Sequence, residues 1–328
     1  MKKALLGVGI AVIVVAVIVG AVLLVITHDF NDKLEAVEAS ANPYIVKTGE
    51  TMVSAHRSGG GIAPENTLMA FENCVESNSF AISIFEFDLH LTKDGELILL
   101  HDETFDRTSN AVEYFGKTEI RPEDYTYDEL RVLNMGEFFT TDSDETPYAG
   151  LRGDDIPDNL RVVKLRDIFD YLSDYGEYRF IIEIKNGGDL GKTAADELYS
   201  ILEEYDMLDR AIIGTFHGEI SEYMESTYPD MLRSAGIKEV VDFYFSSLLG
   251  INHEDGYYKF DALQIPDDDY VFNLGTTRLV NYAHKYNIAV QYWTINEPED
   301  VKHLQSIGAD AVMSDNPDMA YKVIKGEE

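Results

Sequence analysis

Cysteine and basic side chains are both scarce in this chain of 328 residues. The single cysteine, Cys74, excludes an intramolecular disulfide framework, and its apolar helical surroundings are typical of a packed core thiol. Only 26 lysines and arginines stand against 60 acidic residues, which gives a net charge of −34. A surface of this sign argues against nucleic-acid binding and against adhesion to an anionic bilayer, and chiefly indicates solubility.

The chain also lacks linker-like segments, and it contains one long segment without charged residues. No Gly/Ser-rich or Pro-rich stretch divides residues 49–328, so they are predicted to form one domain. Residues 4–27 carry no charge and are long enough, as a helix, to cross a bilayer. We interpret residues 1–27 as an uncleaved transmembrane anchor, because the apolar region of a signal peptide spans roughly 7–15 residues. Cleavage at the small residues 39–41 is the alternative.

The flanks of this apolar run predict its orientation. Lys2 and Lys3 favour a cytoplasmic N-terminus, which would place the rest of the chain outside the cell membrane. Residues 28–48 are polar and weakly patterned, so we expect a short stalk. The sequence therefore predicts a single-pass protein of the cell membrane with an extracellular domain.

Strand-like and helix-like segments alternate along residues 49–328, which is typical of a parallel α/β fold. Eight segments are predicted as strands: 51–56, 82–89, 179–185, 211–215, 231–235, 262–265, 288–293 and 311–313. This pattern predicts a (β/α)₈ TIM barrel, whose active site lies at the carboxyl ends of the strands. A short strand near Leu97 is expected to pair with the second strand as a hairpin. Residues 103–163 lack strong periodicity and are expected to form an insertion with some helix.

Three carboxylates stand where two predicted strands end. Glu86 and Asp88 share one face of their strand, because successive side chains alternate, and Glu183 and Lys185 repeat this spacing. We expect the three carboxylates to converge on one rim of the barrel. Oxygen ligands of this kind suit a hard divalent cation, Ca²⁺ or Mg²⁺. Structural pairing of Glu86 and Asp88 with arginine or lysine is the alternative.

Two histidines flank the carboxylates. His56 ends the first strand and His101 follows the hairpin, and imidazole titrates near neutral pH, so both are candidates for acid–base catalysis. Arg57 offers a two-pronged donor for phosphate oxygens. The Gly-rich loop at residues 59–61 is interpreted either as an anion cradle or as a flexible loop. Trp293, the only tryptophan, is expected to wall the pocket, with a core position as the alternative.

Taken together, these motifs resemble the glycerophosphodiester phosphodiesterase family over residues 56–317. The matching motifs are His56-Arg57, Pro64-Glu65-Asn66-Thr67, Glu86-x-Asp88, Thr92-x-Asp94-Gly95, His101-Asp102, Glu183-x-Lys185 and Trp293-Thr294-x-Asn296. Ser58 departs from the family pattern, which usually has glycine after His-Arg. The resemblance implies a (β/α)₈ barrel. It also implies a role for each site residue: metal ligation by Glu86, Asp88 and Glu183, acid–base catalysis by His56 and His101, phosphate binding by Arg57 and Lys185, and ordering of the His56-Arg57 segment by Glu65.

The expected function is metal-dependent hydrolysis of a glycerophosphodiester to glycerol phosphate and an alcohol. One histidine would act as base and the other as acid, through a cyclic phosphate. The substrate would be a small glycerophosphodiester or a lipid-derived one, met beside the membrane. Two alternatives stay open. One is a lysophospholipase D or a phosphoinositide phospholipase C-like enzyme, and the other is a non-catalytic barrel that binds polymers.

Overall fold

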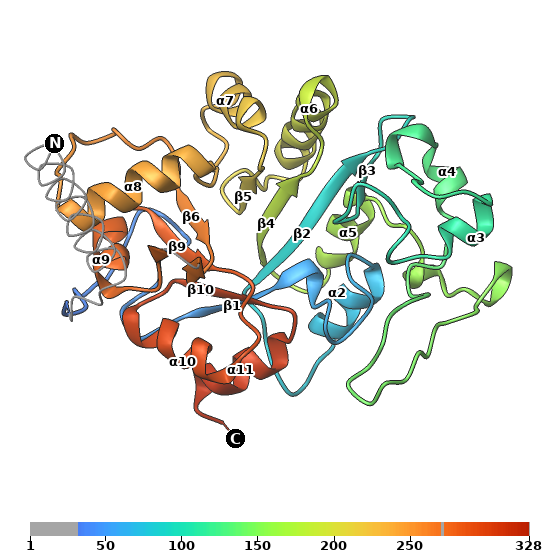
Figure 1. Ribbon diagram of the computed structural model, residues 1–328, viewed down its shortest axis with the longest axis horizontal. Helices are drawn as coiled ribbons and strands as arrows, with labels where there is room; N and C mark the ends of the chain where they lie inside the picture. The colour runs from blue at the N-terminus through green and yellow to red at the C-terminus, as the bar shows by residue number, and fades with distance from the viewer. Residues whose placement is uncertain (1–31, 270–271, 328) are drawn as a thin grey trace, which may run out of the picture.

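A nearly closed barrel of parallel strands forms the centre of the computed structural model, which describes residues 32–269 and 272–327 (Figure 1). Neighbouring strands pair in the order β5-β4-β2-β1-β10-β9-β6. Their bounds are β1 (Met52–Ala55), β2 (Ile84–Leu91), β4 (Arg179–Ile184), β5 (Ala211–Gly214), β6 (Ala262–Ile265), β9 (Ala289–Tyr292) and β10 (Ala311–Ser314). The antiparallel strand β3 (Leu97–Leu99) pairs with β2, as the hairpin prediction requires.

The eighth barrel position is occupied by two single bridges rather than by a full strand. Ile213 of β5 pairs with Arg233, and Ser234 pairs with Ala262 of β6. The segment predicted as the strand 231–235 therefore lies in the expected position, but only two of its residues, Arg233 and Ser234, pair with neighbouring strands. The parallel α/β barrel is confirmed.

Helices cover the outside of the barrel (Figure 1). Their buried apolar residues face the strands, so the largest hydrophobic cluster lies between the strands and the helices. The helices are α2 (Leu68–Val75), α5 (Leu165–Leu172), α6 (Gly188–Glu204), α7 (Gly218–Thr227), α8 (Ile237–Leu249), α9 (Thr277–Lys285), α10 (Pro298–Ile307) and α11 (Pro317–Lys325). None of the helices in the described residues has both the length and the apolar character that a membrane crossing requires. The anchor predicted at residues 1–27 lies outside the described residues.

The segment expected to be a stalk lies against the barrel over its described part, residues 32–48. Tyr44 is fully buried among inward-facing strand residues, and its hydroxyl donates to the carbonyl oxygen of Phe180 at 2.9 Å. The side-chain amide of Asn42 donates to the carbonyl oxygens of Asp261 and Asn287 at 2.7 and 3.0 Å. The polar composition of the segment did not predict this packing, because only one aromatic side chain and a few hydrogen bonds hold the segment against the barrel.

Residues 103–163 build a small structure of their own beside β3. They include the short helices α3 (Ala111–Phe115) and α4 (Tyr127–Leu130) and three 3₁₀ turns (Pro122–Asp124, Gly153–Asp155 and Asp158–Leu160), and otherwise run as loops. A separate hydrophobic cluster holds them together, with Phe105, Leu130 and Met135 packed against Ile98 of β3. Figure 1 shows this region projecting to one side of the barrel. The cluster explains how a segment of weak periodicity still folds.

Candidate active site

A cavity of about 510 Å³ opens at the carboxyl ends of the barrel strands. Eight of the nine residues that the sequence singled out line it: His56, Arg57, Glu86, Asp88, His101, Glu183, Lys185 and Trp293. The ninth, Glu65, lies behind Arg57 and binds its guanidinium. The tertiary structure thus brings together segments that are more than two hundred residues apart in the chain.

Side-chain alternation explains why the carboxylates reach this cavity. On β2, Phe85 and Phe87 join the cluster under the helices, so Glu86 and Asp88 face the barrel interior. Strand β4 repeats the pattern, and Glu183 lies opposite Asp88 in the parallel register. A shift of one residue in either strand would turn the carboxylates into the apolar layer between strands and helices.

Lys185 neutralises two of the three carboxylates. Its Nζ lies 3.0 Å from Asp88 Oδ1 and 2.8 Å from Glu183 Oε1. Burial acts to raise the pKa of Asp88, but the Lys185 charge outweighs it and holds that pKa below its usual value. Burial also acts to lower the pKa of Lys185, yet the two carboxylates keep it raised, so the ammonium stays charged.

Glu86 is the least compensated charge in the site. Burial and the neighbouring charge of Asp88 raise the pKa of Glu86 to about 8, although the backbone N–H of Arg57 donates to its Oε2 at 2.7 Å. The Nε2 atom of His56 lies 3.9 Å from the same oxygen. The positive charge near Glu86 therefore does not offset its burial and the charge of Asp88.

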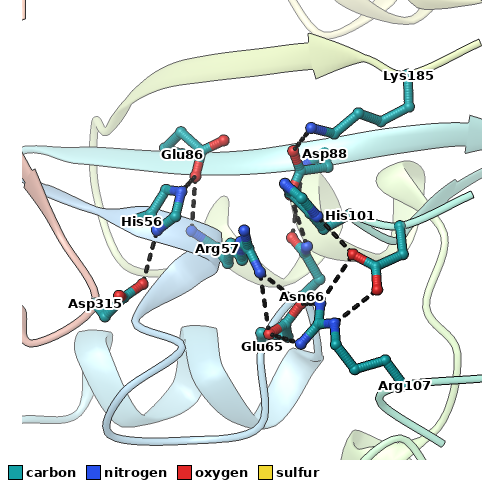
Figure 2. Close-up of polar contacts among 11 residues, drawn as sticks. His56, Arg57, Glu65, Asn66, Glu86, Asp88, His101, Arg107, Lys185 and Asp315 are labelled. Carbon is teal, nitrogen blue, oxygen red and sulfur yellow. Dashed lines mark hydrogen bonds and ion pairs between the residues drawn. The ribbon is translucent and has the colours of Figure 1, made fainter. Parts of the chain in front are cut away.

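His56 is held by a carboxylate that the sequence prediction omitted. Its Nδ1 lies 2.7 Å from Asp315 Oδ1, as Figure 2 shows. The side chain of Asn296 fixes that carboxylate: its Nδ2 donates to Asp315 Oδ2 at 2.6 Å, and its Oδ1 accepts the Asp315 backbone N–H at 3.0 Å. Asp315 directly follows β10. The same strand-end rule that selected the other residues could therefore have found it.

His101 has the same arrangement from a different part of the chain. Its Nδ1 lies 2.7 Å from Oδ1 of the adjacent Asp102. Arg107, another residue that the sequence analysis missed, donates to both oxygens of Asp102 at 2.6 and 3.1 Å. Burial acts to raise the pKa of Asp102, but hydrogen bonds from Arg107 and His101 lower it to about 2. No sequence motif marks Arg107, which lies on a loop of the insertion.

Glu65 joins the two sides of the site. Its carboxylate accepts from Arg57 Nη1 at 3.2 Å and from Arg107 Nη1 and Nη2 at 2.9 and 2.6 Å. The role that the resemblance implied for Glu65, ordering the His56-Arg57 segment, is compatible with these bonds. Its neighbour Asn66 donates to Asp88 Oδ2 at 2.9 Å and so supports one of the three carboxylates.

The Gly-rich loop does not offer its N–H groups as an anion cradle. Those of Gly59 and Gly60 donate to the carbonyl oxygen of His56, and that of Gly61 donates to the carbonyl oxygen of Asp315 at 2.9 Å. A Cβ atom on Gly61 would lie 2.9 Å from that oxygen, so glycine allows this close approach. The loop thus packs the His56 segment against the segment that carries Asp315. Ser58 adopts a φ of +66°, a conformation that favours glycine.

The donor set fits a divalent cation chemically. Glu86, Asp88 and Glu183 supply carboxylate oxygens within one cavity, and the raised pKa of Glu86 is what an added positive charge would reverse. As they stand, no three acidic, histidine or cysteine side chains among the described residues form a ready metal site. The Lys185 ammonium lies between Asp88 and Glu183 and occupies the position of a shared cation.

The cavity has a second, apolar wall. Trp293 packs edge-to-face against Phe216, with ring centroids 6.2 Å apart. Phe245 of α8 and Phe272 continue this wall, with centroids 6.1 Å apart. The site therefore joins a charged half, which carries both histidines, to an aromatic half.

Comparison with known proteins agrees with this geometry. The sequence model of the glycerophosphoryl diester phosphodiesterase family matches residues 56–319. A glycerophosphodiester phosphodiesterase of Caldanaerobacter subterraneus subsp. tengcongensis is 28% identical over 276 residues, covering 84% of this chain and 98% of its own.

Solved structures share the fold. A glycerophosphodiester phosphodiesterase from Agrobacterium tumefaciens aligns with a TM-score of 0.62 at 18% identity, over 83% of this chain and 99% of its own. A phosphodiesterase from Oleispira antarctica, solved in complex with the product sn-glycerol-3-phosphate, aligns with a TM-score of 0.63 at 20% identity, over 84% and 96%. Because the family's sequence model covers most of the chain, this protein belongs to the glycerophosphoryl diester phosphodiesterase family of enzymes.

Proposed function

We propose that this enzyme hydrolyses glycerophosphodiesters to glycerol phosphate and an alcohol, with His56 and His101 as paired acid and base. One observation carries the proposal: each histidine in the cavity has its Nδ1 atom 2.7 Å from a carboxylate oxygen. A carboxylate that accepts the Nδ1 proton fixes the tautomer and leaves Nε2 to exchange protons with a substrate. Family membership supports the substrate class.

The proposed reaction has two proton-transfer steps. The glycerol hydroxyl beside the phosphoester gives its proton to one histidine, and its oxygen attacks phosphorus. The other histidine, protonated, donates to the oxygen of the departing alcohol as the P–O bond breaks. Water then opens the resulting cyclic phosphate with the two roles reversed, which restores both histidines.

Positive charge at the phosphoryl oxygens is the other requirement. Arg57, which lines the cavity with its guanidinium held by Glu65, supplies one such charge, and Lys185 supplies a second. Glu86, Asp88 and Glu183 would hold a divalent cation, Ca²⁺ or Mg²⁺. When bound, such an ion would add further charge stabilisation to the phosphoryl group.

Removing either histidine should abolish most of the turnover. With glycerophosphocholine as substrate and choline release as the assay, His56→Ala and His101→Ala should each lower kcat by about 10²–10⁴-fold. The double variant should fall little further, because each loss interrupts the same proton relay. His303→Ala, at an exposed position on α10, is the matched control. A His101→Ala enzyme that kept half of the wild-type kcat would refute the mechanism.

Asp315 should act as a positioning residue through His56. Asp315→Asn removes the charge that orients His56 but preserves the shape of the side chain, so kcat should fall at least about tenfold while KM changes little. Asp318→Asn, an acidic residue in the first turn of α11, is the control. A rise in KM with unchanged kcat would assign Asp315 to substrate binding instead.

Chelation tests the cation. Enzyme treated with EDTA and then desalted should lose activity and regain it with Ca²⁺ or Mg²⁺. The restoring ion should also raise the melting temperature of the wild type, since a ligand of the folded state stabilises it. The same ion should leave the melting temperature of Glu183→Gln unchanged. Full turnover after chelation would rule out the metal requirement.

The membrane anchor and the extracellular position also stay proposals, supported by the uncharged run at residues 4–27 and by Lys2 and Lys3. The full chain should sediment with membranes, and added protease should remove its catalytic domain from intact cells. A chain that begins at residue 28 should remain in the supernatant. Recovery of the full chain in the soluble fraction would contradict the anchor.

A further inference from the structure

Helix α8 turns a stripe of apolar side chains outward. Ile237, Val241, Phe245 and Leu249 follow one another at intervals of four residues and are 62%, 46%, 39% and 66% exposed. Residues four apart lie on the same face of a helix, so the four form one continuous row. A contiguous exposed apolar surface of this kind marks a place where a ligand or a partner binds.

The row begins inside the catalytic cavity. Ile237, Val241 and Phe245 line the cavity together with His56 and His101, whereas Leu249 lies one turn beyond it. The row and the aromatic wall thus form one groove that leads from the histidines to the surface. In Figure 1, α8 lies between α7 and α9 around the barrel.

The groove is held in a fixed orientation. Arg233, the residue that bridges to β5 in the barrel, is buried and donates to both carboxylate oxygens of Glu239 on α8 at 2.7 and 2.8 Å. The same carboxylate accepts the backbone N–H of Gly236 at 2.8 Å and caps the helix. A two-pronged ion pair of this kind ties the first turn of α8 to the barrel rim. The orientation of the apolar row relative to the barrel is therefore fixed by this ion pair.

We infer that this groove binds the single acyl chain of a lysophospholipid-type substrate, with the phosphodiester placed at the histidines. This inference rests on the proposed function and names its substrate class. From Ile237 to Leu249 the helix rises about 18 Å, at 1.5 Å per residue. One leaflet contributes about half of a bilayer core of about 30 Å, so the row matches the length of one extended acyl chain.

A whole bilayer fits this face less well than one chain does. The net charge of −34 opposes contact with an anionic membrane surface, and the exposed Asp242 directly follows Val241 of the row. A soluble diester such as glycerophosphocholine would leave the row uncovered. A single acyl chain covers the apolar surface and leaves the flanking charges in water.

The reaction is the proposed one with a longer substrate. A monoacyl glycerophosphodiester and one water yield the monoacyl glycerol phosphate and the free alcohol. The P–O bond to the alcohol breaks, a P–O bond to the water oxygen replaces it, and the water protons pass to the alcohol and the phosphate. The acyl ester takes no part.

The test compares the full-length enzyme on glycerophosphocholine and on lysophosphatidylcholines of 6 to 18 acyl carbons, all below their critical micelle concentrations. Choline release reports every reaction. For the wild type, kcat/KM should rise with chain length and exceed that for glycerophosphocholine at least tenfold for the longest chains. In Leu249→Ser, which alters the end of the row outside the cavity, this gain should be lost for the longest chains only. Leu190→Ser, an exposed leucine of α6 that does not line the cavity, should behave as wild type.

The outcomes separate the two proposals. If glycerophosphocholine is not hydrolysed, the proposed function fails. If it is hydrolysed but kcat/KM does not depend on chain length, the proposed function stands and the groove inference is overturned. The inference is equally overturned if Leu249→Ser affects only substrate embedded in phosphatidylcholine vesicles and not monomeric lysophosphatidylcholine, because the row would then contact a membrane.

Discussion

The burial of three carboxylates inside the mouth of the barrel is the constraint on which the rest of the site depends. Ionised carboxylates are costly to bury, and the three carboxylates of this site are not compensated equally. Lys185 lies between Asp88 and Glu183, whereas Glu86 receives only a backbone N–H and a distant imidazole. The negative charge at Glu86 is therefore left without a matching cation. A metal ion could supply that positive charge, either alone or together with an anionic substrate.

Both histidines owe their orientation to residues outside the cavity lining. Asp315 and Asp102 hold the two Nδ1 atoms, and each carboxylate is itself held, by Asn296 and by Arg107. Arg107 belongs to the insertion, which has its own hydrophobic cluster. The stability of that cluster is thereby coupled to the geometry of one catalytic candidate. Variation in the insertion can change the site without changing the barrel.

Sequence reasoning succeeded where a local rule was sufficient. Alternation along two strands placed Glu86, Asp88 and Glu183 on one rim, and strand-end position placed His56 and Trp293 in the same cavity. It failed where partners come from distant segments. Asp315 went unnoticed although it ends a strand, and Arg107 carries no local signal at all. The Gly-rich loop was open to a phosphate-binding interpretation, yet its N–H groups are spent on His56 and Asp315 within the fold.

By itself, the sequence determined the barrel, its polar rim and the chemical character of the site, because side-chain periodicity and strand-end position follow from backbone geometry alone. Only the tertiary structure decided which charge neutralises which, because ion pairs such as Lys185 with Asp88 depend on distances between separate strands. The same holds for Tyr44 and for the apolar row on α8. Whether an apolar side chain is covered depends on what packs beside it, and a linear pattern does not contain that information.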